Sequence, residues 1–346
     1  MCARYARGSP QQAKAGKHIA GGYKACLFAL TGDLDYFCSI LGMPRYDLRS
    51  GPCAWCQCQS TGPNTWTDFR ETAPWRATRW SHAGWHAWGE KSRCALLQLP
   101  GASCWTIAYD YMHVKHLGTD MYQFGSCLAL LVRYVLPDTP EQNLQVCWSF
   151  LKSYFRQHKT PNPYRYLNRL SMFIRNKGKY PKLRGKAAEV KSLGPGLLAL
   201  WEDKMNPNLA IHRQVRLMLR ANCRMEEILS ENKDEWVLPA SAAVEFEETC
   251  RTMLLLQTQL AEHFLQESEA LFDITSKTHM LQEISLMGRC INPRLVWAYA
   301  GEDMMQRMQQ IAMQCTQGNL QGQTTIKMAR HYRLGLHYLF KRLHGI

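Results

Sequence analysis

The sequence predicts an α/β protein with a small sheet and a much larger α-helical part. Two short apolar runs, Ala25–Leu30 and Ala102–Ala108, have the length and the abrupt ends of buried strands. From Glu141 onward, by contrast, apolar residues recur at helical spacing through most of the chain. With 346 residues, 46% of them hydrophobic, the chain can form one large packed domain or two ordinary ones.

The first apolar run ends at a glycine that two acidic residues follow. Gly32 closes the run, and Asp33 and Asp35 come directly after it. A carboxylate at the end of a buried strand is where α/β folds often place chemistry. The alternative interpretation is that one of these aspartates caps the next predicted helix, Leu34–Leu41.

The stretch from residue 53 to 104 is rich in Trp, Pro, Gly and His and lacks helical periodicity. It opens with Cys53-x-x-Cys56-x-Cys58, and two thiolates from one turn suit a tetrahedral zinc site. Such a site would hold together a segment with little regular structure. The alternatives are buried thiols without a metal, or a redox motif. The candidates for the remaining zinc ligands are Cys58, His82, His86, Cys94 and His113.

The second apolar run leads into Asp110-x-x-His113 and then into a helix that reaches about Leu136. Residues at i and i+3 share one face of a helix. An aspartate and a histidine on one face can bind a divalent metal or orient one another. The alternative is a helix cap at Asp110 beside a surface histidine.

Four further helices are expected in the second half of the chain. Lys186–Trp201 is predicted as a helix that is interrupted near Pro195, and Ala242–Phe272 as a long acidic helix. Ser276 is expected to cap the next helix. Glu302 begins an amphipathic helix, where a carboxylate is favoured by the helix dipole whether or not it has another role.

The charge of the chain is large and unevenly distributed. The net charge is +14, yet residues 224–303 hold 15 acidic and 6 basic side chains, a balance of −9. The remainder therefore carries +23. An excess of positive charge on part of a folded chain suggests a polyanion partner, most simply nucleic acid, although a generally basic protein would look the same.

Two stretches concentrate this positive charge around aromatic residues, near Phe173 and Tyr180 and in the C-terminal helix. Basic side chains around aromatic rings suit a nucleic-acid backbone and its bases. The alternatives are a solvated charged face and an amphipathic packing helix. The candidate nucleic-acid contacts are Arg175, Lys177, Lys179, Lys182, Arg184, Lys186, Arg330, Arg333, Lys341 and Arg342.

Neither a membrane span nor a secretion signal is apparent. No continuous apolar run is long enough to cross a bilayer, and the basic N-terminal stretch has no apolar signal core. We therefore expect an intracellular protein. Its 14 cysteines are scattered along the chain, and most are expected to be buried thiols.

Taken together, these segments resemble transposases of the CACTA (En/Spm) superfamily. ACLFALTGDLDYF followed by PCAWC resembles the second catalytic aspartate and the Cys-x-x-Cys of that family. Asp110-x-x-His113 resembles its Asp/Cys-x-x-His motif, and the long helical stretch resembles its α-helical insertion. KTHMLQEISLMGRCINPRLVWAYAGEDMMQRM resembles the segment that leads into the third acid. The likeness covers roughly residues 20–316.

The resemblance implies an RNase H-like core, here incomplete, with a Cys-rich insert and a long helical insertion. In such enzymes three carboxylates hold two Mg²⁺ or Mn²⁺ ions, which activate water or a 3′-hydroxyl for attack on a phosphodiester. Asp33 would be the second acid and Glu302 the third, with Asp35 and Asp303 as fallbacks. Asp110 and His113 would form a supporting motif. The implied partner is DNA, and the implied location is the nucleus.

One part of the family pattern is missing. The first acid belongs on an earlier strand, yet no Asp or Glu precedes Asp33. Loss of one ligand from a two-metal site should abolish phosphoryl transfer, so the resemblance implies a protein that is inactive alone. A homo-oligomer or another chain would then supply the missing strands. The alternative functions are a non-enzymatic, zinc-stabilised nucleic-acid or chromatin-binding module and a redox or metal-handling protein.

The expected organisation follows from these motifs in chain order. The parts are a basic arm (1–20), a partial RNase H-like core (21–52), a candidate zinc insert (53–104), a strand and helix with the DxxH motif (105–136), a helical insertion (137–275), a helix pair that completes the core (276–316) and a basic C-terminal helix (317–346).

Overall fold

The computed structural model describes residues 27–87, 94–99, 102–175, 178–316 and 321–345. The predicted basic arm, Lys177 and the start of the Ala25–Leu30 run lie outside these ranges. The described chain is mostly helical, with a small two-stranded sheet. Within the described residues, no helix is long and apolar enough to cross a membrane. Most of the described cysteines are buried thiols, as expected.

The sheet pairs β1 (Leu30–Gly32) with β2 (Ile107–Tyr109) in parallel, and Gly32 lies opposite Tyr109. Both strands begin later than the apolar runs predict. The residues before β2 form a 3₁₀ turn, Cys104–Thr106, which a hydrogen bond from the Ser103 amide to the Thr106 hydroxyl fixes at 3.0 Å. β2 is fully buried, whereas β1 is only partly buried, so the expectation of two buried strands holds for β2 alone.

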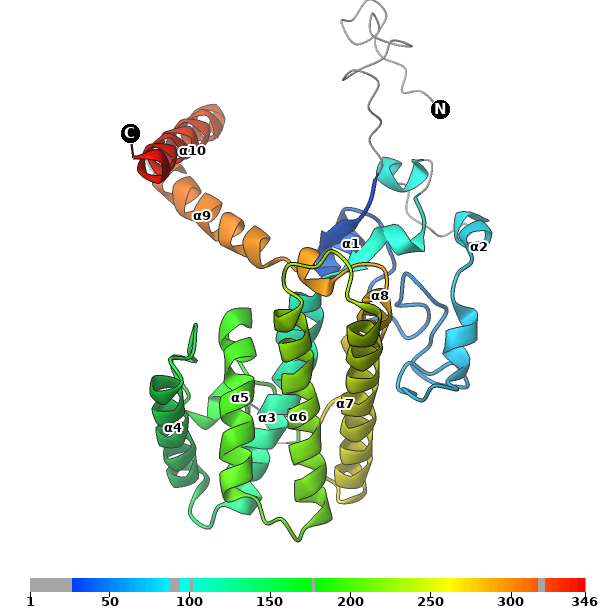
Figure 1. Ribbon diagram of the computed structural model, residues 1–346, viewed down its shortest axis with the longest axis vertical. Helices are drawn as coiled ribbons and strands as arrows, with labels where there is room; N and C mark the ends of the chain where they lie inside the picture. The colour runs from blue at the N-terminus through cyan, green and yellow to red at the C-terminus, as the bar shows by residue number, and fades with distance from the viewer. Residues whose placement is uncertain (1–26, 88–93, 100–101, 176–177, 317–320, 346) are drawn as a thin grey trace, which may run out of the picture.

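The helical part is a bundle that stands below the sheet in Figure 1. Its first helix runs through Met112–Thr119, where it is kinked at Leu117, and on through α3 (Asp120–Leu130) and Leu131–Val135. The neighbouring helices pack in sequence order, α5 on α4, α6 on α5 and α7 on α6. Their bounds are α4 Pro140–Gln157, α5 Ala187–Lys204, α6 Ala210–Glu231 and α7 Ala240–Gln266.

Short helices and a terminal pair complete the fold. α1 (Leu34–Ser39) follows β1, and α2 (His82–Ala87) lies in the Trp-rich segment. α8 (Ser276–Met287) packs against Met112–Thr119 and β2. α9 (Tyr299–Thr316) leads away from the bundle to α10 (Gln321–His344), as Figure 1 shows.

Three helix predictions need correction. α5 is not interrupted near Pro195 but continues through it to Lys204. The glycines on either side of Pro195 let neighbouring helices approach closely. α7 ends at Gln266 rather than at Phe272, because Ser268 has a φ of 62° and leaves the helical conformation. Thr275 rather than Ser276 is the N-cap of α8, and its backbone amide donates to the Thr278 hydroxyl at 3.3 Å.

The packing of α3 depends on the absence of a side chain at Gly125. A Cβ there would lie 3.0 Å from the Leu183 nitrogen and from the carbonyl carbon and oxygen of Pro181. We expect Gly125→Ala to lower the free energy of unfolding by about 1–3 kcal/mol, because backbone atoms cannot move aside as a flexible side chain can. Chemical denaturation measures this loss. Gly301→Ala is the control, since a Cβ there meets nothing within 4 Å, and an equal loss in both variants would contradict the prediction.

Candidate metal centre and acidic edge

Four buried side chains from two distant segments form a candidate metal centre. Cys53 and Cys56 come from the Cys-rich turn, and His279 and Glu283 come from α8. One ligand atom from each lies within 4.8 Å of the others. The Cys56 sulfur is 3.2 Å from His279 Nε2. Two thiols, an imidazole and a carboxylate that are buried side by side form a ligand set that suits a divalent metal such as zinc.

α8 presents its two donors on one face. His279 and Glu283 are one helical turn apart, so both side chains point the same way. The ring of Trp75 packs edge-on against the His279 ring, with centroids 4.4 Å apart. Arg79 donates to Glu283 Oε2 at 2.8 Å. Glu283 Oε1 and His279 Nδ1 are buried without a hydrogen-bond partner, and a carboxylate oxygen left in this way is explained by a cation beside it.

Cys58, the third predicted thiol, lies beside the centre but is not one of the four residues whose ligand atoms lie within 4.8 Å of one another. Its side chain is fully buried and interacts with Cys53, Cys56 and His279. Three thiolates and one imidazole would complete a tetrahedral zinc site of the Cys₃His type, with Glu283 beside it. The alternative set replaces Cys58 by Glu283.

The electrostatics of the centre favour a thiolate at Cys53, whose interaction raises the pKa of the Cys56 and Cys58 thiols. Burial alone would raise the pKa of the Cys53 thiol, but its interactions with Cys56, Cys58 and His279 hold that pKa well below the ordinary value. Burial would likewise lower the pKa of His279, and the charge of neighbouring thiolates raises it instead. A cation bound here would take over the stabilising role of the imidazolium.

The histidines that sequence reasoning proposed as zinc ligands lie elsewhere. His82 and His86 are on α2, and their ring centroids are 4.5 Å apart. Because Trp85 occupies the buried side of this short helix, both histidines lie toward its outer side. Neither they nor Cys94 and His113 belong to the metal-ligand group found among the described residues. His279 and Glu283 were missed, although their i, i+4 spacing on a predicted helix was a usable signal.

A second feature, the acidic edge, lies where the two strands end. Gly32 and Tyr109 are paired, so the next residues, Asp33 and Asp110, leave the sheet at the same edge. Asp33 caps α1, because its Oδ1 accepts a hydrogen bond from the Tyr36 amide at 2.6 Å. The capping interpretation of this aspartate is therefore confirmed. Asp35 is exposed on the first turn of α1.

Asp110 orients His113 rather than facing solvent. Its Oδ2 binds Nδ1 of His113, and its Oδ1 accepts from the amides of Met112 and Ala298 at 3.0 and 2.9 Å. His113 Nε2 then lies 3.4 Å from Oε1 of Glu302. The predicted Asp–His pair is thus confirmed, and it connects the end of β2 to α9.

Glu302 and Asp303 line a cavity of about 420 Å³ between α9 and the start of α5, with Lys186 on its far wall. Glu302 is half-exposed there. Among the described residues, no group of three ligand atoms within 4.8 Å of one another includes Asp33 or Glu302, so a metal site shared by these two acids stays a prediction.

Lys277 of α8 contacts the helix that follows the acidic edge. Its ammonium donates to the carbonyl oxygens of His113 and Leu117, both at 3.1 Å. Burial lowers the pKa of Lys277 to about 8, and the charge of Lys182 acts in the same direction. Asp33 and Asp110 oppose this shift, so Lys277 lies within electrostatic range of both aspartates and of Lys182.

A basic cavity of about 520 Å³ lies around Lys182. Arg175, Lys179 and Tyr180 share its walls, and the Lys182 ammonium lies 5.0 Å from the centre of the Tyr122 ring. Burial, followed by repulsion from Arg175, lowers the pKa of Lys182. The cavity therefore gathers three of the predicted nucleic-acid contacts.

The remaining predicted contacts are spread over other surfaces. Arg184 is exposed beside the basic cavity residues in sequence, and Lys186 faces the cavity of Glu302. Arg330, Arg333, Lys341 and Arg342 are exposed on α10. No protein-family model, curated protein or solved structure matches the chain. The likeness to CACTA transposases therefore stays a prediction from the motifs.

Proposed function

We propose that the chain is a transposase-derived protein that binds DNA next to its acidic edge and is not a complete nuclease by itself. The observation that carries the proposal is the adjacency of opposite charges around Lys277. Asp33 and Asp110 leave adjacent parallel strands, and both of them, like Lys182, lie within electrostatic range of Lys277. In α/β folds, functional side chains often lie at the carboxyl edge of parallel strands. The neighbouring cations can contact the phosphates of a DNA backbone that passes this edge.

The DNA contacts in this proposal are the cations of the basic cavity. Arg175, Lys179 and Lys182 lie close enough to one another to meet successive phosphates, and such contacts release counterions. Tyr180, which is partly exposed at the same cavity, offers a ring on which a base stacks. In a cell this ligand places the protein in the nucleus.

The metal centre has a structural role in this proposal. Zinc held by three cysteines and His279 has no open position for a substrate. It would fix the Cys-rich insert to α8, and α8 also carries Lys277. The acidic edge would take Mg²⁺ or Mn²⁺ only with a further acid, because both Asp110 oxygens already accept bonds from the protein.

DNA binding is tested by fluorescence anisotropy with a labelled duplex over a range of salt concentrations. We expect binding that weakens steeply with salt, and a triple variant Arg175→Ala, Lys179→Ala, Lys182→Ala with a salt slope smaller by about two to three, since each phosphate contact adds about 0.9 to the slope. Lys152→Ala with Arg156→Ala, on the exposed side of α4, is the control. No binding by the wild-type protein, or an equal loss in the control, would refute the proposal.

A non-enzymatic binding module is the second candidate, and the full occupation of the Asp110 oxygens favours it. Nicking of supercoiled plasmid with Mg²⁺ or Mn²⁺ would exclude the binding module, whereas both candidates predict none for the chain alone. We expect no nicking by the chain alone. Nicking that disappears in Asp33→Asn and in Glu302→Gln would instead assign strand cleavage to this chain.

A further inference from the structure

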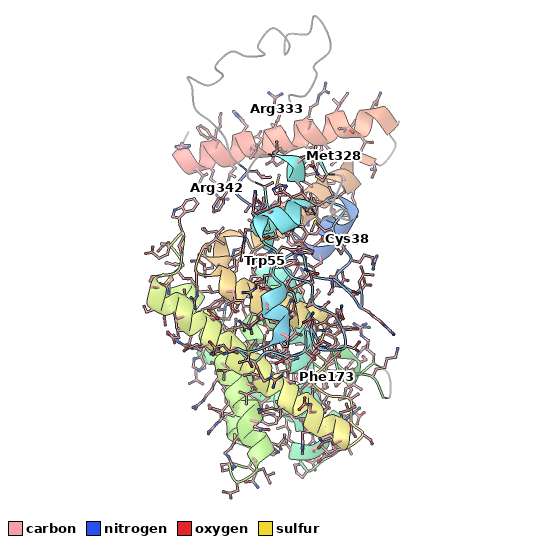
Figure 2. The ribbon with its side chains drawn as sticks, turned by 90° about the vertical axis from the view of Figure 1, so that its right-hand side faces the viewer. Cys38, Trp55, Phe173, Met328, Arg333 and Arg342 are labelled. Carbon is pink, nitrogen blue, oxygen red and sulfur yellow. The ribbon has the colours of Figure 1, made fainter. Side chains whose placement is uncertain are left out.

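The outer half of α10 carries an apolar stripe that nothing in the described structure covers. Leu336, Leu339, Phe340 and Leu343 follow one another at helical spacing and are 46–72% exposed. The inner half packs on α9, where the Tyr332 hydroxyl meets the Met304 sulfur. Figure 2 shows α10 crossing one end of the molecule, apart from the bundle. An apolar stripe of this length in water indicates a docking surface.

The charge of α10 restricts what can dock there. The helix has five Lys and Arg residues and no Asp or Glu. Two copies of α10 would therefore repel one another along their length. Nucleic acid would neutralise the cations but leave the leucines and Phe340 in water. The fitting partner is an acidic surface with an exposed apolar centre.

The chain itself has such a surface, at the turn between α6 and α7. Its centre is Trp236, which is 75% exposed, and Val237 and Val244 flank it. This surface is called the Trp236 patch. Residues 231–248 contain one lysine and six carboxylates. Glu231 and Glu245 pair with Arg224, and Glu247 is buried and pairs with Arg289. The exposed carboxylates that remain for a partner are Asp234, Glu235 and Glu248.

The backbone beneath Trp236 is held in place by Asn292. This side chain is fully buried, and its Nδ2 donates to the carbonyl oxygens of Asn232 and Glu235 at 2.8 and 2.9 Å. The Asn292 amide also donates to the carbonyl oxygen of Trp236 at 2.8 Å. The indole is thus presented to solvent on a fixed turn. A rigid, exposed tryptophan ringed by polar groups is typical of a binding hot spot.

We propose that α10 of one copy docks on the Trp236 patch of a second copy, with the apolar stripe over Trp236 and the cations facing the carboxylates. α9 separates α10 from the patch of its own chain, since its 18 residues span about 27 Å. Reciprocal exchange gives a two-fold dimer with two equal contacts. The inference does not depend on DNA binding.

Charge reversal tests the contact by sedimentation equilibrium of the full chain. The helix variant carries Arg333→Glu, Lys341→Glu and Arg342→Glu, and the patch variant carries Asp234→Lys, Glu235→Lys and Glu248→Lys. We expect the wild-type chain to dimerise and each variant alone to be monomeric, because like charges then face one another. Mixing the two variants should restore a dimer, since both contacts of the mixed pair are complementary. Rescue by mixing also demonstrates that neither variant is misfolded.

The apolar centre is tested separately. Trp236→Ala should weaken the dimer at least tenfold, as expected for a hot spot. Tyr166→Ala, at a ring that is 69% exposed elsewhere, should leave the dimer unchanged. A wild-type monomer at all concentrations, a dimer that survives the patch variant, or no dimer in the mixture would overturn the proposal. Survival of the dimer in the patch variant would point to pairing through another surface.

Discussion

Cys56→Ser and His279→Ala are each expected to release a stoichiometric zinc ion and to lower the melting temperature by at least about 10 °C. The two donors are 223 residues apart in the chain, so the metal would tie the Cys-rich insert to α8. Binding of structural zinc contributes on the order of 10 kcal/mol in small zinc domains, and only part of that needs to be realised here. Without the ion, buried thiols would face an imidazole and a carboxylate that has an unpaired oxygen.

Metal analysis of the purified protein and thermal denaturation with and without a chelator measure these effects. Cys290→Ser is the control, because that thiol is exposed and outside the centre. If the ligand set is Cys₃His, Cys58→Ser should lose zinc and Glu283→Gln should keep it; the reverse outcome would assign the fourth position to Glu283. If the purified wild-type protein contained no zinc and the variants had unchanged melting temperatures, the prediction of a structural metal ion would be wrong.

Thiol alkylation addresses the redox alternative with the same protein. A closed zinc site should protect Cys53, Cys56 and Cys58 from iodoacetamide until the metal is removed. Rapid alkylation of all three in the metal-replete native protein would instead favour a redox or metal-handling function, since thiols that react so readily are accessible.

The metal centre illustrates how far the sequence alone can lead. Cys53-x-x-Cys56 was recognisable because its two ligands lie in one turn. The i, i+4 spacing of His279 and Glu283 marks a candidate ligand pair, but it does not show that the packing of α8 on β2 brings this pair to the thiols. His82 and His86 misled for a related reason. Their spacing fits a ligand pair, but the burial of Trp85 decides which way that helix faces.

The acidic edge was predictable in a similar, partial way. The order of strand, glycine and aspartate predicted that Asp33 follows a strand, and the i, i+3 spacing left open whether Asp110 pairs with His113 or only caps a helix. The strand boundaries were less predictable, because each strand has only three residues and a local hydrogen bond at Ser103 decides where β2 begins. The exposure of Trp236 had no sequence signal, since an isolated tryptophan is ordinarily buried.

A buried ion pair beneath the acidic edge gives the largest stability effect expected from removal of one side chain. Lys115 is fully buried, and its ammonium lies 2.9 Å from Asp120 Oδ2 and 3.2 Å from Glu226 Oε1. It also donates to Asn222 Oδ1 at 2.9 Å. Burial would lower the pKa of Lys115, but the charges of Asp120 and Glu226 raise it instead, so the lysine stays charged.

We expect Asp120→Ala to lower the free energy of unfolding by about 3–5 kcal/mol, because it leaves a buried ammonium with too few partners. Urea denaturation of the full chain measures the change. The double variant Lys115→Met, Asp120→Leu should recover most of the loss, since it removes both charges and keeps the volume. Asp47→Ala, which breaks an exposed pair with Arg45, is the control and should have no measurable effect.

This network also fixes the parts of the candidate site relative to one another. His116 donates or accepts between Glu226, at 2.9 Å, and the Tyr299 hydroxyl, at 2.7 Å. Tyr299 begins α9, three residues before Glu302, and His116 lies one turn after His113. Loss of the Lys115–Asp120 pair should therefore loosen the contact between His113 and Glu302 as well as the bundle. If Asp120→Ala were no more destabilising than Asp47→Ala, the buried pair would not hold these elements, and the position of α9 would depend on its own packing.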